Sequence, residues 1–311
     1  MNKLITIIIF LFTIATGVNA QKIWQQYKLV KPIKLSNVNN LTIKGDSING
    51  GDVECITLSH CHNIRITHCF LGNSTKPGIF LYDCTNVRID SVFMTNVASG
   101  VYAMDSFSIS VTHCEGLNMI GPMPRGQFVQ FDNVKGTHCR VNYNKFENIL
   151  GNGDPEDAIN IFKSNGTPKD PIQIIGNMIR GGGPSTNGGG IMLGDYGGSY
   201  QVAKNNVLVN PGQYGMAVAG GSHISIINNK IYAKQQPFTN VGLYIWAQGG
   251  VACSLNTVSG NQVNWTMKDG TKNDIWNPGN CGRVAGWDTN TPSANIDESI
   301  LPAKLLSSGN K

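Results

Sequence analysis

The chain has 311 residues and a formal net charge of +5, and only 14% of its residues are charged. Globular domains average about 25% charged residues, so this composition excludes a coiled coil, a long charged helical bundle and a disordered acidic or basic tail. The 37 glycines, together with many asparagines, indicate a β protein that is rich in turns.

Residues 1–20 have the pattern of a secretory signal peptide. Lys3 precedes an apolar run over residues 4–16, and small residues ending at Ala20 close it. The run is too short to span a bilayer comfortably, and no basic flank follows it. We therefore expect a protein that is secreted or periplasmic after cleavage, with no membrane anchor and a single domain over residues 21–311.

Short apolar–polar–apolar segments recur along the chain, each followed by a turn, at steps of about 22 to 33 residues. Asparagine recurs at the turn position, whose occupants are Cys69, Val92, Cys114, Asn144, Asn177, Asn206, Asn229 and Asn261. Stacked amides can hydrogen-bond to one another and to the backbone of a bend. An antiparallel sandwich also has many short strands, but it does not place asparagine repeatedly at one phase. The sequence therefore predicts an all-β fold, a right-handed parallel β-helix with three strands per coil.

Both ends of the chain depart from this repeat. Residues 21–38 precede the first clear copy, and we expect them to form an N-terminal cap. The strand period is lost after residue 264, where three tryptophans lie among glycine, asparagine and proline. We expect residues 264–311 to form a C-terminal cap region that shields the last coil.

The eight cysteines divide into two groups. Six lie within alternating apolar segments, where cysteine behaves as a small buried hydrophobe. Cys253 and Cys281 lie instead in sequence rich in glycine and asparagine, and cysteines of an exported chain can be oxidised to a disulfide. We predict a disulfide between these two, and no zinc site because the chain has no CxxC pair.

The middle coils are longer than the shortest copies, and the extra residues predict loops at 121–127, 152–157, 181–190 and 234–241. Such loops beside the second strand of each coil are expected to wall a groove. The predicted floor is the row of outward side chains Tyr82, Tyr102, Phe131, Asn160, Phe162, Met192, Tyr244 and Trp246. Each aromatic ring alone is as consistent with packing under a loop, but a row on one face favours the binding of an extended polymer.

The polar residues near these coils fit two kinds of chemistry. Asp157 and Asp195 could supply the carboxylate pair of a glycoside hydrolase, or serve a uronate epimerase. β-Elimination instead needs a base and cations that hold the developing negative charge, and the candidates for those roles are Lys163, Arg180, Tyr214 and Lys234. The residues predicted to bind substrate are Asp157, Asp195, Gln213, Asn160, Tyr244 and Trp246.

Two further interpretations of these residues stay open, and one class of partner is not expected. Lys163 and Asp195 could form a salt bridge between neighbouring coils rather than serve a reaction. The acidic loop at residues 153–157 could be a calcium site or a solvated turn, and we expect no other cofactor and no other metal. Nucleic-acid binding is not expected, because the charge is mild and no run of basic residues occurs.

Four segments of the middle coils carry a resemblance to a known family: EDAINIFKS (156–164), GGGPS (181–185), GIMLGD (190–195) and NPGQYG (210–215). They resemble secreted bacterial β-helix polysaccharide lyases, most closely the alginate lyases of polysaccharide lyase family 31, over roughly residues 140–300. The resemblance implies β-elimination on an acidic uronate polymer, with alginate the expected substrate, by a monomeric enzyme. The alternatives are a glycoside hydrolase or epimerase on the same scaffold, and a non-catalytic carbohydrate-binding protein.

Overall fold

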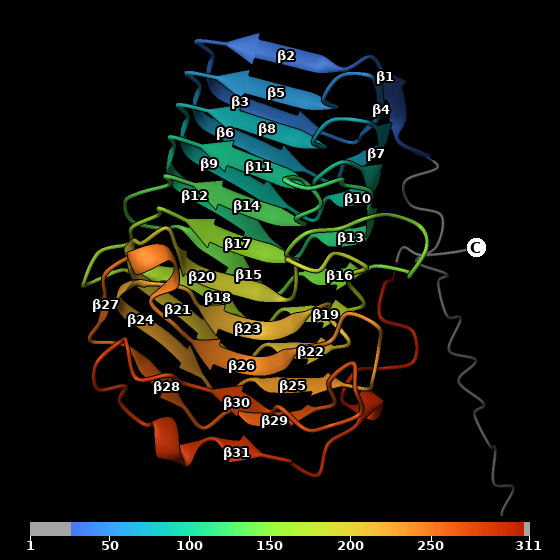
Figure 1. The fold of residues 1–311 in the computed structure, drawn as a ribbon. Helices are drawn as coiled ribbons and strands as arrows, with labels where there is room; N and C mark the ends of the chain where they lie inside the picture. Colours follow the sequence, from blue (N-terminus) through green and yellow to red (C-terminus); the bar gives the residue numbers. More distant parts are fainter. Residues whose placement is uncertain (1–25, 308–311) are drawn as a thin grey trace, which may run out of the picture.

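The computed structural model describes residues 26–307, and the predicted signal peptide lies outside them. The described chain winds through coil after coil, and each coil adds one strand to each of three parallel sheets (Figure 1). This arrangement confirms the predicted right-handed parallel β-helix. Within residues 26–307, no helix is long and apolar enough to cross a membrane.

We call the three sheets A, B and C. Sheet A contains β1 (Lys28–Val30), β4 (Asp46–Gly51), β7 (Phe70–Ser74), β10 (Phe93–Val97), β13 (Glu115–Met119), β16 (Lys145–Glu147), β19 (Met178–Arg180), β22 (Val207–Val209), β25 (Lys230–Ala233), β29 (Gln262–Trp265) and β31 (Thr291–Pro292). Sheet B contains β2 (Ile33–Ser36), β5 (Ile56–Ser59), β8 (Ile79–Tyr82), β11 (Val101–Met104), β14 (Val129–Asp132), β17 (Ile159–Phe162), β20 (Ile191–Asp195), β23 (Tyr214–Val218), β26 (Val241–Ile245) and β30 (Ile275–Trp276). Sheet C contains β3 (Asn39–Lys44), β6 (His62–Thr67), β9 (Thr85–Asp90), β12 (Phe107–Thr112), β15 (Arg140–Asn142), β18 (Ile172–Ile175), β21 (Ser199–Lys204), β24 (Gly221–Ile227) and β27 (Cys253–Ser254), with β28 (Thr257–Ser259) also on β24. Three short 3₁₀ turns complete the described structure: η3 (Gln248–Gly250), η4 (Trp287–Thr289) and η5 (Glu298–Ile300).

Alternation along each strand builds the core. In β8, Ile79 and Leu81 face inward and are fully buried, while Tyr82 is 39% exposed. The parallel register places Ile79 beside Val101 of the next coil, and the same column continues through every later strand of sheet B. Each buried aliphatic side chain stabilises the fold by about 1.5–3 kcal/mol, so the stack is held mainly by its inward columns.

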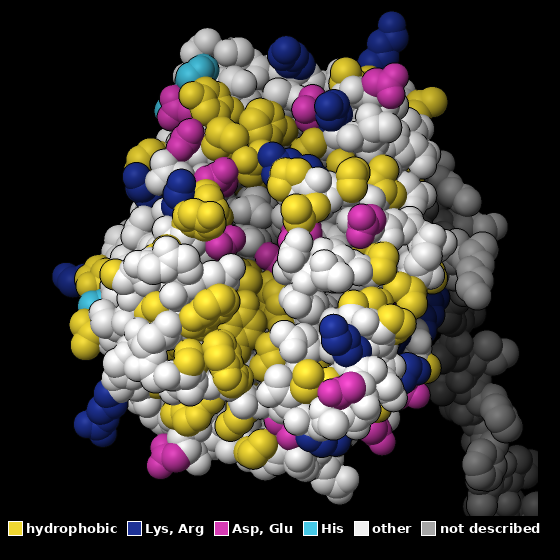
Figure 2. All heavy atoms as spheres, viewed as in Figure 1, with side chains coloured by type: hydrophobic (Ala, Val, Ile, Leu, Met, Phe, Trp, Pro, Cys, Tyr) yellow, Lys and Arg dark blue, Asp and Glu magenta, His cyan; other side chains and the backbone are white. Residues whose placement is uncertain are grey.

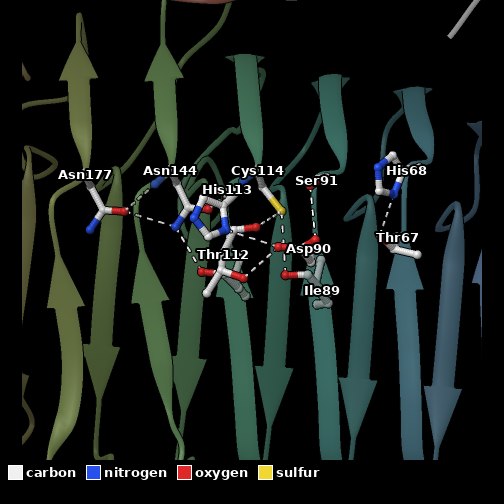
Figure 3. A network of polar contacts seen from close by, with 11 residues as sticks. Thr67, His68, Ile89, Asp90, Ser91, Thr112, His113, Cys114, Asn144 and Asn177 are labelled. Atoms are coloured by element: carbon white, nitrogen blue, oxygen red, sulfur yellow. Dashed lines mark hydrogen bonds and ion pairs between the residues drawn. The ribbon is translucent and has the colours of Figure 1, made fainter. Parts of the chain in front are cut away.

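Asparagines at the corner between sheets C and A form a hydrogen-bonded ladder (Figure 3). The side-chain Oδ1 of Asn177 accepts from both the backbone N and the Nδ2 of Asn144, each at 3.0 Å. The Nδ2 of Asn144 also donates to the carbonyl of Val111 at 3.0 Å, and the ladder continues to Asn290. Earlier coils place cysteine at this corner: the thiol of Cys114 donates to the carbonyl of Thr112. Recurring asparagine at this phase is therefore explained by backbone groups that the bend leaves without strand partners.

The two ends of the chain are more regular than the sequence suggests. Strands β1 and β2 pair in parallel with β4 and β5, so residues 28–36, within the predicted N-terminal cap, belong to the first coil. At the other end, β30 and β31 continue sheets B and A beyond residue 264. Cys253 and Cys281 form a disulfide across this last coil.

The C-terminal segment, residues 298–307, returns along the outer face of sheet A as a strap. Its residues Leu301, Leu305 and Leu306 are buried against an apolar patch that includes Phe93 and Val209. The strap starts beside β22 and β25 and reaches β13, where the backbone N of Ser307 donates to the carboxylate of Glu115 at 3.0 Å. The last described residue thus contacts a coil that is almost 200 residues earlier in the sequence.

Candidate functional site

A groove of about 1110 Å³ lies on the outer face of sheet B. One wall consists of the loops that enter the strands of sheet B, and all four loops predicted from the long coils contribute to it, through residues such as Arg125, Glu156, Asn187 and Asn240. Figure 2 shows the hollow, with hydrophobic side chains along its floor and acidic side chains near its middle. The coils that depart from the minimum length therefore do lie around a single concave surface.

The floor of the groove follows from strand register. One outward column runs through Tyr102, Gln130, Asn160, Met192, Ala217, Tyr244 and Trp276, each directly beside the next. A second column places Asp132 beside Phe162, and Phe162 beside Asp195. The prediction that Phe131 lies on the floor is wrong by one residue. Phe131 is fully buried in the core column between Ala103 and Ile161.

Two carboxylates at the centre of the groove share one amide group. The Nδ2 of Asn160 donates to Asp157 Oδ2 at 2.8 Å and to Asp195 Oδ2 at 3.0 Å. The two hydrogens of an amide lie about 120° apart, so the two carboxylate oxygens are about 5 Å from each other when each accepts one of them. Asn160 is held in turn by Gln130, whose Nε2 lies 3.4 Å from Asn160 Oδ1.

Asp157 is the most deeply buried of the groove carboxylates, at 3% exposure. Its Oδ1 accepts from the backbone N of Gly189 at 3.0 Å and from the hydroxyl of Tyr214. Burial raises the pKa of Asp157 to about 7, although these donors act in the opposite direction. A carboxyl group with this pKa is about half protonated at pH 7 and carries its proton below it, as a general acid must.

The pKa values of Asp195 and Glu156 are also raised. Burial is the main cause that raises the pKa of Asp195, with a contribution from the charge of Asp132. Burial also raises the pKa of Glu156, which accepts a hydrogen bond from Ser185 at 3.2 Å. Four acidic side chains, Asp132, Glu156, Asp157 and Asp195, thus line the groove.

Aromatic rings lie at both ends of the groove. At one end, Tyr102 donates its hydroxyl hydrogen to Asp132 at 2.9 Å, and the guanidinium carbon of Arg125 lies 4.2 Å from the centre of the Tyr102 ring. At the other end, Trp276 is 41% exposed and packs edge-on against Tyr244 and Trp246. The strands of Tyr102 and Trp276 are six steps apart in sheet B, which corresponds to about 29 Å.

All six residues predicted to bind substrate line this groove: Asp157, Asp195, Gln213, Asn160, Tyr244 and Trp246. Lys163 is an exposed neighbour of the groove, and its Nζ lies over the rings of Phe162 and Tyr196, at 4.8 and 5.6 Å, rather than in the salt bridge to Asp195. Tyr214 lies beneath the groove: it is 1% exposed, and burial raises its pKa well above the usual value. Its buried hydroxyl orients Asp157 instead of facing a substrate.

Two of the predicted catalytic cations lie elsewhere, so their placement in the groove is wrong. Arg180 belongs to sheet A, where it pairs with Glu147 at 3.3 Å and donates to carbonyls of the strap. Lys234 is 61% exposed and lies 3.8 Å from Glu298 of the strap. Arg180 ends β19 and Lys234 follows β25, both in sheet A, and their side chains project from the face that the strap covers.

Sequence reasoning missed several groove residues, of which Gln130, Asp132, Arg125 and Trp276 are the most informative. A stricter use of strand alternation predicts the first two. Val129 and Phe131 face inward, so Gln130 and Asp132 face outward. Arg125 lies in a loop that was correctly assigned to the wall. Trp276 was assigned to the cap region, although the last coil extends the floor.

The calcium reading of the acidic loop gains no support from the geometry. Among residues 26–307, no group of three or more histidine, cysteine, aspartate or glutamate side chains is arranged to hold a metal ion. The carboxylate of Asp157 instead accepts hydrogen bonds from protein donors, as described above, and Glu156 accepts one from Ser185.

Comparison with known proteins gives a likeness in fold. No protein-family model and no curated protein sequence matches the chain. PfbA, a surface adhesin of Streptococcus pneumoniae, matches with a TM-score of 0.50 and 11% identity over 84% of this chain and 74% of its own. The catalytic domain of a GH87 α-1,3-glucanase matches at 0.46 and 12% identity (85% and 56% covered), and the DFA-IIIase of Arthrobacter chlorophenolicus A6 at 0.43 and 12% (87% and 69%). At such identities the likeness establishes the parallel β-helix and nothing finer.

Proposed function

We propose that this protein is an extracellular carbohydrate-active enzyme, a glycoside hydrolase that cleaves a glycan chain in the groove on sheet B. The observation that carries the proposal is the pair Asp157 and Asp195 on the single amide nitrogen of Asn160. Hydrolysis of a glycosidic bond uses two carboxyl groups, and a separation of about 5–5.5 Å is that of retaining enzymes.

The environments of the two carboxyl groups suggest their roles. Asp157 has a pKa of about 7 and acts as the general acid that protonates the leaving oxygen. Asp195 is less buried and acts as the nucleophile that forms a glycosyl–enzyme intermediate. Water then releases the sugar, with Asp157 as the base, so the anomeric configuration is retained.

β-Elimination on a uronate polymer is the second candidate, because the sequence resembles alginate lyases and cations lie near the groove. Lys163 is at the rim, and Arg125 lies beside Tyr102. Two observations weigh against it. Burial and the bond to Asp132 raise the pKa of Tyr102 to about 12, which makes it a poor base, and four carboxylates would face the acidic substrate.

An export route is part of the proposal. The pattern of residues 1–20 is that of a signal peptide, and the Cys253–Cys281 disulfide suits an oxidising compartment.

The test is a product assay on a panel of purified polysaccharides. We expect new reducing ends without the ultraviolet absorbance of an unsaturated uronate, and proton NMR of the first product is expected to show a retained anomer. Asp157→Asn and Asp195→Asn are each expected to lower kcat by about 10²–10⁴-fold, whereas Asp52→Asn, an exposed position outside the groove, is expected to leave it unchanged.

Other outcomes point to the alternatives. Ultraviolet-absorbing product from alginate or pectate supports the lyase and contradicts hydrolysis. An altered ratio of uronate epimers without chain cleavage supports an epimerase. Binding with no product from any polymer supports a non-catalytic carbohydrate-binding protein.

A further inference from the structure

The groove is strongly acidic for a protein whose overall charge is positive. Its lining residues within the described chain include four acidic side chains, Asp132, Glu156, Asp157 and Asp195, and one basic side chain, Arg125. The formal charge of +5 therefore comes from residues outside the groove lining. A concave site with low-dielectric walls concentrates the field of its charges, so this groove attracts cations and repels anions.

The single cation of the lining is already engaged. The guanidinium of Arg125 lies over the Tyr102 ring, and its Nη1 donates to the carbonyl of Pro124 at 3.0 Å. Lys163 at the rim stacks on two aromatic rings. Even when both cations are counted and Asp157 is protonated, acidic groups still outnumber basic groups in and around the groove.

The hydrogen-bonding groups of the wall suit hydroxyl groups. The floor amide of Asn160 is already bonded to Asp157, Asp195 and Gln130, but Gln213, Asn240 and Asn273 line the wall at the end that holds Trp276. Amides both donate and accept, as sugar hydroxyls do, whereas a substrate carboxylate offers only acceptors and needs donors or cations. The carboxylates of the protein have no donor to offer it when they are ionised.

The exposed rings of Trp276 and Trp246 at one end suit the apolar faces of sugar rings, whereas Tyr102 at the other end is 6% exposed and lies under Arg125. Asp195 lies on β20, three strands from Tyr102 on β11 and three strands from Trp276 on β30. Each interval corresponds to about 14 Å, so the carboxylate pair lies near the middle of the floor. A glycan that stacks on Trp276 and follows the floor toward Tyr102 therefore extends to either side of the point of cleavage.

We propose that the substrate is an uncharged glycan chain, bound along the floor with a sugar ring on Trp276 and cut internally, and that the groove rejects uronate polymers. The part of this inference that concerns cleavage rests on the proposed function, whereas the part that concerns binding rests on the charge and lining of the groove alone. Binding and cleavage are measured separately, so that either can fail without the other.

Affinity electrophoresis of the full-length mature protein measures binding. Native gels contain one polysaccharide each: a set of neutral α- and β-glucans, mannan, galactan and xylan, against alginate, pectate and glucuronan. We expect retardation by at least one neutral polymer and no retardation by the three polyuronates at low ionic strength. At about 0.15 M salt the neutral interaction is expected to persist, since it does not depend on charge.

Variants separate the two parts of the groove. Trp276→Ala is expected to weaken neutral binding about tenfold through loss of the ring as a stacking surface. Its matched control is Tyr143→Ala, an aromatic residue that is 54% exposed on another face, and this variant is expected to bind normally. The double variant Asp132→Asn, Glu156→Gln is expected to gain retardation by polyuronates, because it removes two charges that repel them.

Two results overturn the proposal: retardation by a polyuronate at low ionic strength in the unaltered protein, or retardation by none of the neutral polymers. Cleavage is read separately, from reducing ends and product length. A neutral polymer that is bound but not cut supports the binding inference and contradicts hydrolysis. Release of only the terminal sugar from a bound polymer contradicts internal cleavage.

Discussion

The ionisation of Asp157 predicts an unusual dependence of stability on pH. In the unfolded chain an aspartate titrates at about 3.9, whereas in the folded protein burial raises the pKa of Asp157 to about 7. Between these values the folded state binds one proton more than the unfolded state. The free energy of unfolding therefore falls as pH rises through this window, by about 1.4 kcal/mol per pH unit from this residue.

The full effect of Asp157 follows from the width of the window. A shift of about three units corresponds to about 4 kcal/mol, and the side chain is only 3% exposed, so solvent screens it little. The contribution of Asp157 is fully present below pH 4 and is lost by pH 7. Asp90 and Asp170, whose pKa values are lowered by their hydrogen-bond partners, have the opposite dependence.

The substitution Asp157→Asn isolates this contribution, because an amide does not titrate. Urea unfolding followed by tryptophan fluorescence gives the free energy of unfolding of both proteins across this pH range. We expect the difference, unaltered protein minus variant, to fall by about 4 kcal/mol from pH 4 to pH 7. The same difference for the exposed control Asp52→Asn is expected to show no such fall. A difference for Asp157→Asn that is constant or rises with pH refutes the reasoning.

Three further predictions concern the scaffold. Asn144→Ala removes a buried amide that joins two coils and is expected to lower stability by about 1–3 kcal/mol, seen as a lower Tm by circular dichroism. Leu301→Ala is expected to cost about 2–5 kcal/mol and to increase binding of a hydrophobic dye, because it loosens the strap; an unchanged Tm contradicts the burial described. Reduction of the disulfide that closes a separation of 28 residues is expected to destabilise the protein by about 3–4 kcal/mol, and Cys253→Ser with Cys281→Ser should match the reduced protein.

Much of the fold could be predicted because each coil of a solenoid repeats the same sequence pattern and the same contacts. The corner asparagines recur at one phase because each meets the same backbone groups, and the ladder through Asn144 shows those contacts. Long coils also identified the walls of the groove, because extra residues can only leave the stack as loops. The pairing of Cys253 with Cys281 followed from their separation from the apolar alternation.

The candidate site was predicted less well, because register and facing depend on single residues. A slip of one residue moved Phe131 from the core to the floor and hid Asp132. Arg180 and Lys234 were assigned to the groove by their nearness to long loops, but each lies at the end of a strand of sheet A, one corner away. The sequence pattern does not reveal that both side chains contact the strap, Arg180 through Pro302 and Lys234 through Glu298.

The strap also bears on how the protein folds. Coils of a solenoid contact only their neighbours, so an open stack can fray from either end. Here the last described residues bind the side of coils made much earlier, as the contact between Ser307 and Glu115 shows. Leu301, Leu305 and Leu306 can be buried against the patch that includes Phe93 and Val209 only after the strap has been synthesised. Folding therefore includes a late docking of the strap on sheet A, and a chain that ends before Leu301 lacks this contact even when its coils have formed.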